Sequence, residues 1–149
     1  MDPAPLIPHA GNAILLDALR ETGRADQLAA SFTVRAGTAF SDADGSLPGW
    51  VGVEILAQVI AAFASLRHGR PGEPARLGLL LGVREYRCSR DRFPPGMRLD
   101  AQIVESMSDG QALGVFDGIL RSGDVVIAQG ILSTYRVRDP QRFAAGQDP

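Results

Sequence analysis

The feature that most constrains this fold is an apolar segment, Trp50 to Leu66, that leaves almost no polar face. Glu54 and Gln58, near its start, are its clearest polar interruptions. A helix that is apolar nearly all round must be wrapped by other elements, because no side of it can face water. The segment therefore predicts a buried central helix. A membrane span is disfavoured, because the segment is short for one and carries a charge.

Proline and glycine divide the rest of the chain into strands. Before the helix we expect an extended segment, a short helical or irregular segment and one strand, over residues 1–10, 12–22 and 28–35. After it we expect four consecutive antiparallel strands, over residues 77–89, 97–107, 112–121 and 125–137. A frayed polar tail should follow, over residues 139–149. This order predicts one α+β domain over residues 1–149 with a hot-dog fold, a curved antiparallel sheet wrapped around one long central helix. Pairing of two such sheets edge to edge would give a dimer and remove an exposed edge.

Composition excludes several classes of function. A formal net charge of −2 and a pI near 5.6 give no reason to expect nucleic-acid binding. The single Cys88 excludes an internal disulfide, and two distant histidines argue against a metal site, so we expect no metal and no cofactor. The sequence contains no nucleophile elbow, phosphate loop or dinucleotide fingerprint. The start of the chain has no basic segment typical of a signal peptide, so we expect a cytoplasmic protein.

Glu54 is the sharpest candidate for chemistry. It falls in the first turns of the buried helix, where a lone carboxylate is costly unless it is paired or neutral. Burial raises the pKa of a carboxyl, which suits a general acid. Gln58 lies one turn later on the same face and could orient it, and we also expect Gln58 to bind substrate. The alternative is a Glu54 that only caps the helix or pairs with an arginine.

Three further groups of residues could serve a site. Backbone amides around Gly49, Trp50 and Gly52, at the helix start, could polarise a carbonyl group of a bound ligand. His9 lies in a segment bracketed by proline and glycine and could act as a base, whereas His68 sits at the helix end, where a capping role fits better. A run of arginines is either a solvated edge or a docking surface for an acidic partner, and it comprises Arg84, Arg87, Arg90 and Arg92.

Several stretches of the sequence are similar to a known superfamily. The stretch from Leu47 to Gln58 resembles the helix start of FabA/FabZ-type hydroxyacyl-carrier-protein dehydratases, and Ile7-Pro8-His9 followed by residues 14–17 resembles their opening. The match is closer to the ApeP-like branch, which is associated with aryl polyene biosynthesis. Three stretches of this sequence resemble motifs of that branch. Residues 50–54 resemble Trp-Val-Gly-Ile-Glu, residues 80–86 resemble Leu-Leu-Gly-x-Arg-x-Tyr, and residues 113–116 resemble Leu-Gly-Val-Phe. The similarity runs from about Leu6 to Phe143.

The resemblance implies a 3-hydroxyacyl-[acyl-carrier-protein] dehydratase that forms a trans-2-enoyl product in fatty-acid-like or aryl polyene synthesis. It implies Glu54 as the catalytic carboxylate and an acyl carrier protein as partner, within a homodimer or a hetero-oligomer with a second dehydratase. The usual His-Phe-Pro-Gly motif is missing, because residues 40–43 read Phe-Ser-Asp-Ala. His9 or a partner subunit would then supply the base. Two alternatives remain open: a hot-dog acyl thioesterase, and a non-catalytic partner subunit of an active dehydratase.

Overall fold

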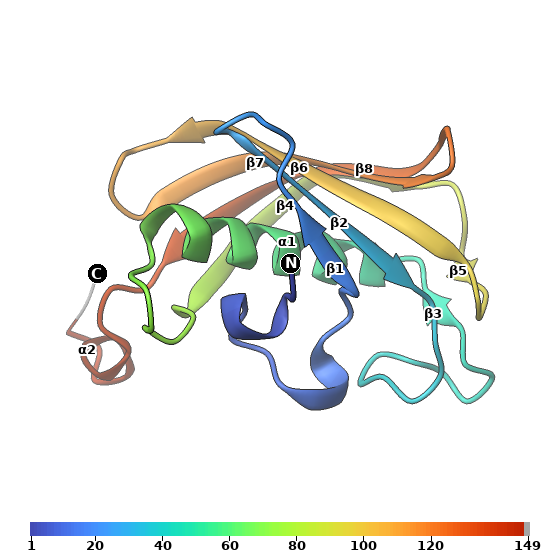
Figure 1. Ribbon diagram of the computed structural model, residues 1–149, viewed down its shortest axis with the longest axis horizontal. Helices are drawn as coiled ribbons and strands as arrows, with labels where there is room; N and C mark the ends of the chain where they lie inside the picture. Colours follow the sequence, from blue (N-terminus) through green and yellow to red (C-terminus); the bar gives the residue numbers. More distant parts are fainter. Residues whose placement is uncertain (148–149) are drawn as a thin grey trace.

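The computed structural model, which describes residues 1–147, has one long helix beneath an arched antiparallel sheet (Figure 1). The helix is α1 (Val51–His68). The strands of the sheet are β1 (Ala18–Arg20), β2 (Gln27–Thr33), β4 (Gly78–Cys88), β6 (Arg98–Ser108), β7 (Leu113–Ser122) and β8 (Val125–Arg136). A second, two-stranded sheet joins β3 (Leu47–Pro48) to β5 (Arg92–Phe93) beside the start of α1. The predicted α+β arrangement of one central helix and a curved antiparallel sheet is confirmed.

The order of strands in the large sheet is β1-β2-β6-β7-β8-β4, with every neighbouring pair antiparallel. The prediction of four consecutive strands was therefore incomplete, because β4 crosses to the far edge and pairs with β8. Strand β6 instead pairs with β2, in a register that sets Phe32 opposite Leu99. The crossing leaves β4 as a long edge strand, next to one side of α1.

Alternation along the strands builds the core. On β2, Leu28, Ala30 and Phe32 are buried, and so is Val34 just beyond the end of the strand, on the same face. On β8, the inward positions run through Gly130 and Leu132, which are both buried. These side chains and one face of α1 form a continuous hydrophobic core.

The expectation that α1 is enclosed on all sides was wrong. One face, including Ile55, Leu56 and Val59, is fully buried, whereas Ala57, Ala61 and other residues of another face are only partly covered. By length and composition alone α1 could also cross a membrane, but half of it is buried inside this fold, as in a core helix. An apolar helix with one incompletely covered face indicates that something further packs there.

The chain ends also differ from the prediction. Residues 1–10 are not simply extended, because Ala4–Leu6 form a 3-10 turn (η1), and a second such turn (η2) spans Gly11–Ala13. The tail is ordered as the short helix α2 (Pro140–Ala144). Its Asp139 carboxylate accepts hydrogen bonds from two backbone amides of the first turn, which is why the tail does not fray there. The end of the predicted tail, residues 148–149, lies outside the described part of the chain.

Candidate functional site

The two residues singled out for chemistry, His9 and Glu54, lie side by side. The imidazole Nε2 of His9 is 2.9 Å from Oε1 of Glu54, and about a quarter of each side chain is exposed, 28% and 25%. His9 comes from the irregular segment between η1 and η2, and Glu54 from the first turn of α1. The Nδ1 atom of His9 is buried and has no hydrogen-bond partner within residues 1–147.

Glu54 is not the lone, almost fully buried carboxylate that the sequence suggested. The same oxygen that faces His9 also accepts a hydrogen bond of 3.0 Å from the Gln58 side-chain amide. Its second oxygen, Oε2, has no hydrogen-bond donor among the described residues. The carboxyl group therefore has one oxygen held by the protein and one oxygen free for another molecule.

Gln58 ties the N-terminal segment to α1. It is fully buried, its amide nitrogen donates to the Ala13 carbonyl at 2.8 Å, and its oxygen accepts from the Leu15 amide at 3.0 Å. One side chain thus fixes both the strand-like segment that follows His9 and the orientation of Glu54. The predicted orienting contact is present. Gln58 was also predicted to bind substrate, but its polar atoms are engaged by the protein.

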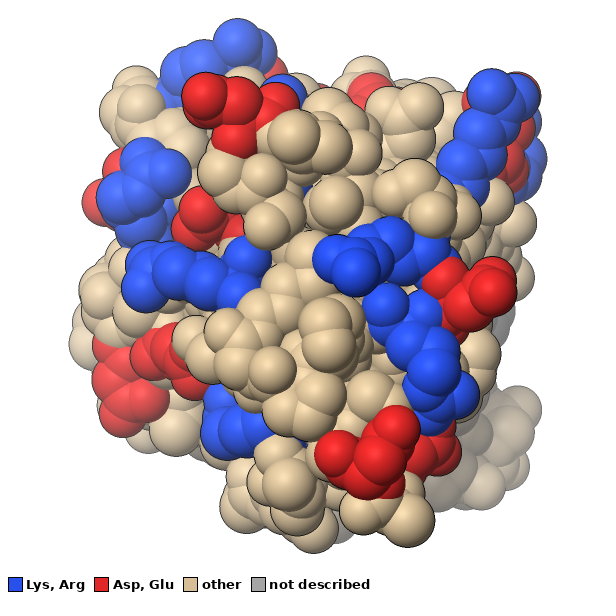
Figure 2. All heavy atoms as spheres, turned by 90° about the vertical axis from the view of Figure 1, so that its right-hand side faces the viewer, with Lys and Arg blue, Asp and Glu red and all other residues tan. Residues whose placement is uncertain are grey.

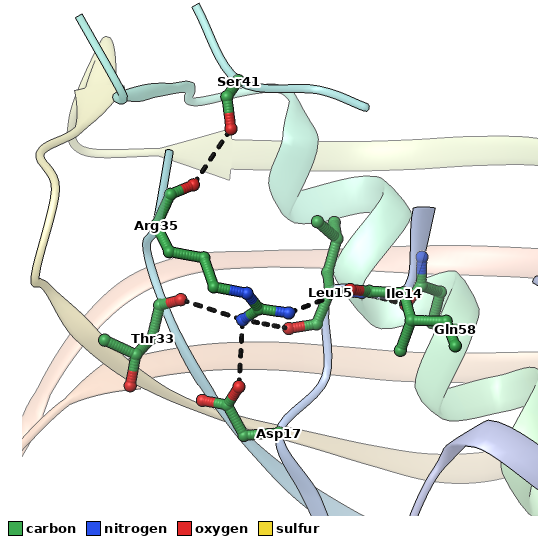
Figure 3. Close-up of polar contacts among 7 residues, drawn as sticks. All are labelled: Ile14, Leu15, Asp17, Thr33, Arg35, Ser41 and Gln58. Atoms are coloured by element: carbon green, nitrogen blue, oxygen red, sulfur yellow. Dashed lines mark hydrogen bonds and ion pairs between the residues drawn. The ribbon is translucent and has the colours of Figure 1, made fainter. Parts of the chain in front are cut away.

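Arg35 fastens the same segment from the other side (Figure 3). Its guanidinium donates to the Asp17 carboxylate at 2.9 Å and to the carbonyls of Ile14 and Leu15 at 3.0 and 3.5 Å. Sequence reasoning missed this role. The available signal was an arginine at the end of the predicted strand and an aspartate in the N-terminal segment, but nothing in the sequence shows that they meet.

Tyr86 packs into the start of α1. Its hydroxyl donates to the Gly49 carbonyl at 2.7 Å, and burial, the first cause, raises its pKa above the ordinary value. A Cβ added at Gly52 would overlap that hydroxyl, so only glycine fits there. The irregularity between Arg84 and Arg87, where Glu85 takes a left-handed φ of 53°, lies at the point where the strand turns Tyr86 inward.

This packing occupies amides that were expected to hold a ligand. The Gly49 amide donates to the Asp91 carbonyl at 2.7 Å, and the Gly52 amide to the Gly49 carbonyl at 3.2 Å. Trp50 points outward and is 61% exposed. Neither these residues nor Gln58 lines the cavity beside Glu54. The structure therefore gives Gly49 and Gly52 a packing role, because the turn is closed by β5 and by Tyr86.

A largely apolar cavity of about 190 Å³ begins at His9 and Glu54. It runs along the incompletely covered face of α1, past Ala57, Ala61 and Ala64. Its other wall is the edge strand β4, from Gly78 to Leu80, and the end of β8. The small alanines leave the width of this groove open, so an extended apolar chain could lie along the helix with its reactive end at Glu54.

The arginines predicted to dock a partner are exposed. Arg84 and Arg87 lie on β4 and Arg90 just beyond its end, and none of the three has an ion-pair partner within the described residues. The fourth member of the run, Arg92, pairs with Asp42. Figure 2 shows the end of the molecule near β3 and β5, where arginines and acidic side chains alternate around uncharged surface.

A central helix under a curved sheet, with an apolar groove along the helix, defines a hot-dog protein. The chain belongs to the ApeP-like family, described as ApeP dehydratase, whose model matches residues 1–145. No curated protein matches this sequence. The assignment confirms the resemblance seen in the sequence.

Solved structures agree with this fold. The dehydratase heterocomplex ApeI:P from Xenorhabdus doucetiae matches with a TM-score of 0.85 and 27% identity over 99% of both chains. A mutant of the fluoroacetyl-CoA-specific thioesterase FlK matches with a TM-score of 0.63 and 13% identity, over 85% of this chain and 96% of that one. A mutant of the phenylacetic acid degradation protein PaaI from Thermus thermophilus matches with a TM-score of 0.56 and 17% identity, over 80% of this chain and 93% of that one. The last two show the fold alone.

Proposed function

We propose that this protein supplies the catalytic pair for dehydration of a 3-hydroxyacyl thioester carried on an acyl carrier protein. The observation that carries the proposal is the 2.9 Å contact between His9 and Glu54 at the head of the apolar groove. Membership of the ApeP-like family gives the reaction class. The groove along α1 supports an acyl chain as the substrate, because its lining is mostly apolar.

The contact suits a paired removal of a proton and a hydroxide. His9, with its own proton on Nε2, takes the proton from C2 on Nδ1, the C2–C3 double bond forms as the C3–oxygen bond breaks, and Glu54, starting as the carboxylic acid, gives the proton on its free Oε2 to the leaving hydroxyl. This leaves an imidazolium next to a carboxylate. Transfer of the Nε2 proton across the 2.9 Å contact neutralises both groups and returns the pair to its starting charges.

A second subunit is part of the proposal. Strand β4 is an edge of the sheet, and it exposes Leu80, Leu81 and Val83 by 43%, 57% and 36%. A long apolar edge of this kind pairs with another strand unless it is protected. The same edge forms a wall of the groove, so a partner placed there would also complete the substrate site. The similar ApeI:P structure is a dehydratase heterocomplex, which supports a second hot-dog dehydratase as that partner.

Arg90, together with Arg84 and Arg87, is the proposed docking surface for an acidic carrier protein. The three guanidinium groups have no carboxylate partner within residues 1–147 and are therefore available to an acidic surface. Arg84 and Arg87 lie on β4, so a partner strand would approach them, whereas Arg90 lies beyond that edge.

A non-catalytic role is the second candidate, and the burial of His9 Nδ1 favours it. Nε2 is engaged by Glu54, so Nδ1 is the ring nitrogen with a free lone pair, yet it is covered in the isolated chain. A substrate reaches it only if binding of substrate or partner shifts the segment around His9. If that shift does not occur, the chain stabilises an active dehydratase that supplies its own histidine.

The test is the intact mass of a 3-hydroxyacyl carrier protein after incubation with the full chain, alone and with the second hot-dog dehydratase of the same organism. Variants Glu54→Gln and His9→Ala are compared with His68→Ala, which removes the other histidine, at the far end of α1. We expect loss of one water with the wild type and with His68→Ala. Both site variants should lower the rate by roughly 10²–10⁴-fold, as for loss of a general acid or base.

Each other outcome has a definite meaning. Dehydration that needs the partner and is unchanged by Glu54→Gln would show that this chain is the non-catalytic subunit. Release of the free acid and the free carrier thiol would identify a thioesterase. Loss of water that His9→Ala leaves unchanged would remove His9 from the mechanism and leave Glu54 in it.

A further inference from the structure

Arg136, at the end of β8, occupies a position where the sheet otherwise places core residues. The inward-facing positions of this strand run Ala128, Gly130, Leu132, Thr134 and Arg136, because alternate residues share a face. The first three are buried, and the last is a half-buried arginine. A charged side chain at the inner end of an otherwise apolar row carries a cost in desolvation, so its position needs an explanation.

The surroundings of Arg136 confirm that the guanidinium is confined. One Nη2 hydrogen bond goes to the Gln111 carbonyl, and the Nε atom is buried with no partner in the described chain. Desolvation is the first cause that lowers the pKa of Arg136 from its ordinary value, and nearby Arg76 and Arg138 add to it. The head group is therefore held in place without being fully satisfied by the protein.

Arg136 also lies on the boundary between two cavities. Arg136 lines both the groove of about 190 Å³ that starts at Glu54 and a second cavity of about 40 Å³, which lies against Phe63 and His68; Arg76 lines the first of these but not the second. Among residues 1–147, four line both spaces: Ile60 and Ala64 from α1, and Thr134 and Arg136 from β8. Arg136 is the charged member of this shared wall.

We infer that Arg136 closes the acyl groove and sets the longest acyl chain that this protein accepts. The inference rests on the proposed function, which places the thioester end at Glu54. From Glu54 to Ala64 the helix rises about 15 Å, which an extended chain of roughly ten to twelve carbons would span. A longer aliphatic chain would press its terminus against the guanidinium and strip it of water, which is unfavourable.

The test measures binding, so it does not depend on turnover. Thioether analogues of acyl-pantetheine, with chains from about four to sixteen carbons, are titrated calorimetrically into the full chain and into its complex with the second dehydratase. In the wild type, affinity should rise about fourfold for each added methylene, as expected for ~0.8 kcal/mol per buried CH₂, until the groove is full. Beyond that length affinity should level off or fall.

Arg136→Ala should join the two cavities and extend the rising part of the series by several carbons. The matched control is Arg138→Ala, which removes a neighbouring guanidinium that also bonds Gln111 but lines neither cavity. A limit that stays in place in Arg136→Ala, or that moves equally in Arg138→Ala, overturns the inference. If Arg136→Ala does not fold, Ala64→Leu gives the reverse test, because a larger side chain in the shared wall should shorten the limit. If the affinity of the wild type for the analogues does not depend on chain length at all, the proposed acyl groove itself is overturned.

Discussion

The two ends of α1 are built in opposite ways. At its start, Val51, Gly52 and Ile55 are buried, and Tyr86 packs so closely that no side chain larger than hydrogen fits at Gly52. Towards its end, Ala61 and other small residues are only partly covered, and two cavities adjoin the helix. Buried polar groups do not divide in this way: Gln58 near the start makes three hydrogen bonds, but both the Nδ1 atom of His9 near the start and the Nε atom of Arg136 near the end have no partner in the described residues.

This difference matches what each end has to do in the proposed reaction. An acid and a base must be held within a fraction of an ångström of a productive geometry, which tight packing and satisfied hydrogen bonds provide. An acyl chain needs a groove, and a groove is a place where the protein leaves its own helix uncovered. Dense packing at Gly52 and Gln58, which holds the start of α1 and orients Glu54, and loose packing beyond Ala57 are therefore two requirements of one substrate.

The largest effect on stability should come from Gln58→Leu near the start of α1, which is the tightly packed end, or tight end, of the helix. Leucine matches the volume but leaves the Leu15 amide and the Ala13 carbonyl without their partner, at a cost of about 2–4 kcal/mol in the free energy of unfolding. Chemical denaturation measures it. Gln129→Leu, on an exposed position of β8, is the matched control and should change stability by less than about 0.5 kcal/mol. Equal effects of the two variants would contradict the claim that polar contacts fix this end.

A smaller loss should follow Gly52→Ala, because the added methyl group meets the Tyr86 hydroxyl. We expect a cost of about 1–3 kcal/mol, typical of overpacking. In a Tyr86→Phe background the cost should shrink, because the clashing oxygen is gone, and a double-mutant cycle measures the coupling. Ala61→Leu, which adds a larger group at the loose end, should stay within about 0.5 kcal/mol. A cost at Ala61 as large as that at Gly52 would erase the contrast between the two ends.

Most of the fold could be predicted from the sequence, because its signals are local. The apolar segment gives α1, and Gly and Pro give the strand limits to within a few residues. The crossing of β4 to the far edge could not be predicted, since strand order depends on pairing between distant segments. The short strands β1, β3 and β5 were missed because two or three residues carry no period.

In the candidate site, too, the residues with a local signal could be predicted and those that depend on distant contacts could not. Glu54 could be singled out because a carboxylate in an apolar segment is unusual at any position. His9 was a weaker prediction, since nothing local shows that it meets Glu54. The amides of Gly49 and Gly52 looked free in the sequence, but β5 and Tyr86, which arrive from some 40 residues later, occupy this turn. Contacts made only through the sheet, including those of Arg136, were invisible beforehand.

The smallest expected effect concerns pH, and it should have opposite signs at two carboxyl groups, Glu105 and Asp44. Near the end of α1, desolvation is the first cause that raises the pKa of Glu105, which also faces Arg136, Arg67 and Asp26. A raised carboxyl pKa means that stability is fully present below the ordinary value, about 4.3, and is lost as the pH rises through the folded pKa. Glu105→Gln should therefore gain stability relative to the wild type as the pH rises from about 4 to 7.

In the exposed loop before β3, which leads to the start of α1, the sign reverses. Hydrogen bonds from Ser46 lower the pKa of Asp44, so its contribution is present above the ordinary value, about 3.9, and is lost as the pH falls through the folded pKa. Asp44→Asn should be less stable than the wild type near neutral pH and should approach it in acid. Both groups are largely solvated, so thermal unfolding over a pH series is read for sign alone. If Glu105→Gln instead loses stability relative to the wild type as the pH rises, the attraction of the Glu105 carboxylate to Arg136 outweighs its desolvation. The loose end of α1 would then be stabilised by its charges, and the polar cluster around Arg136 would be part of what holds the groove closed.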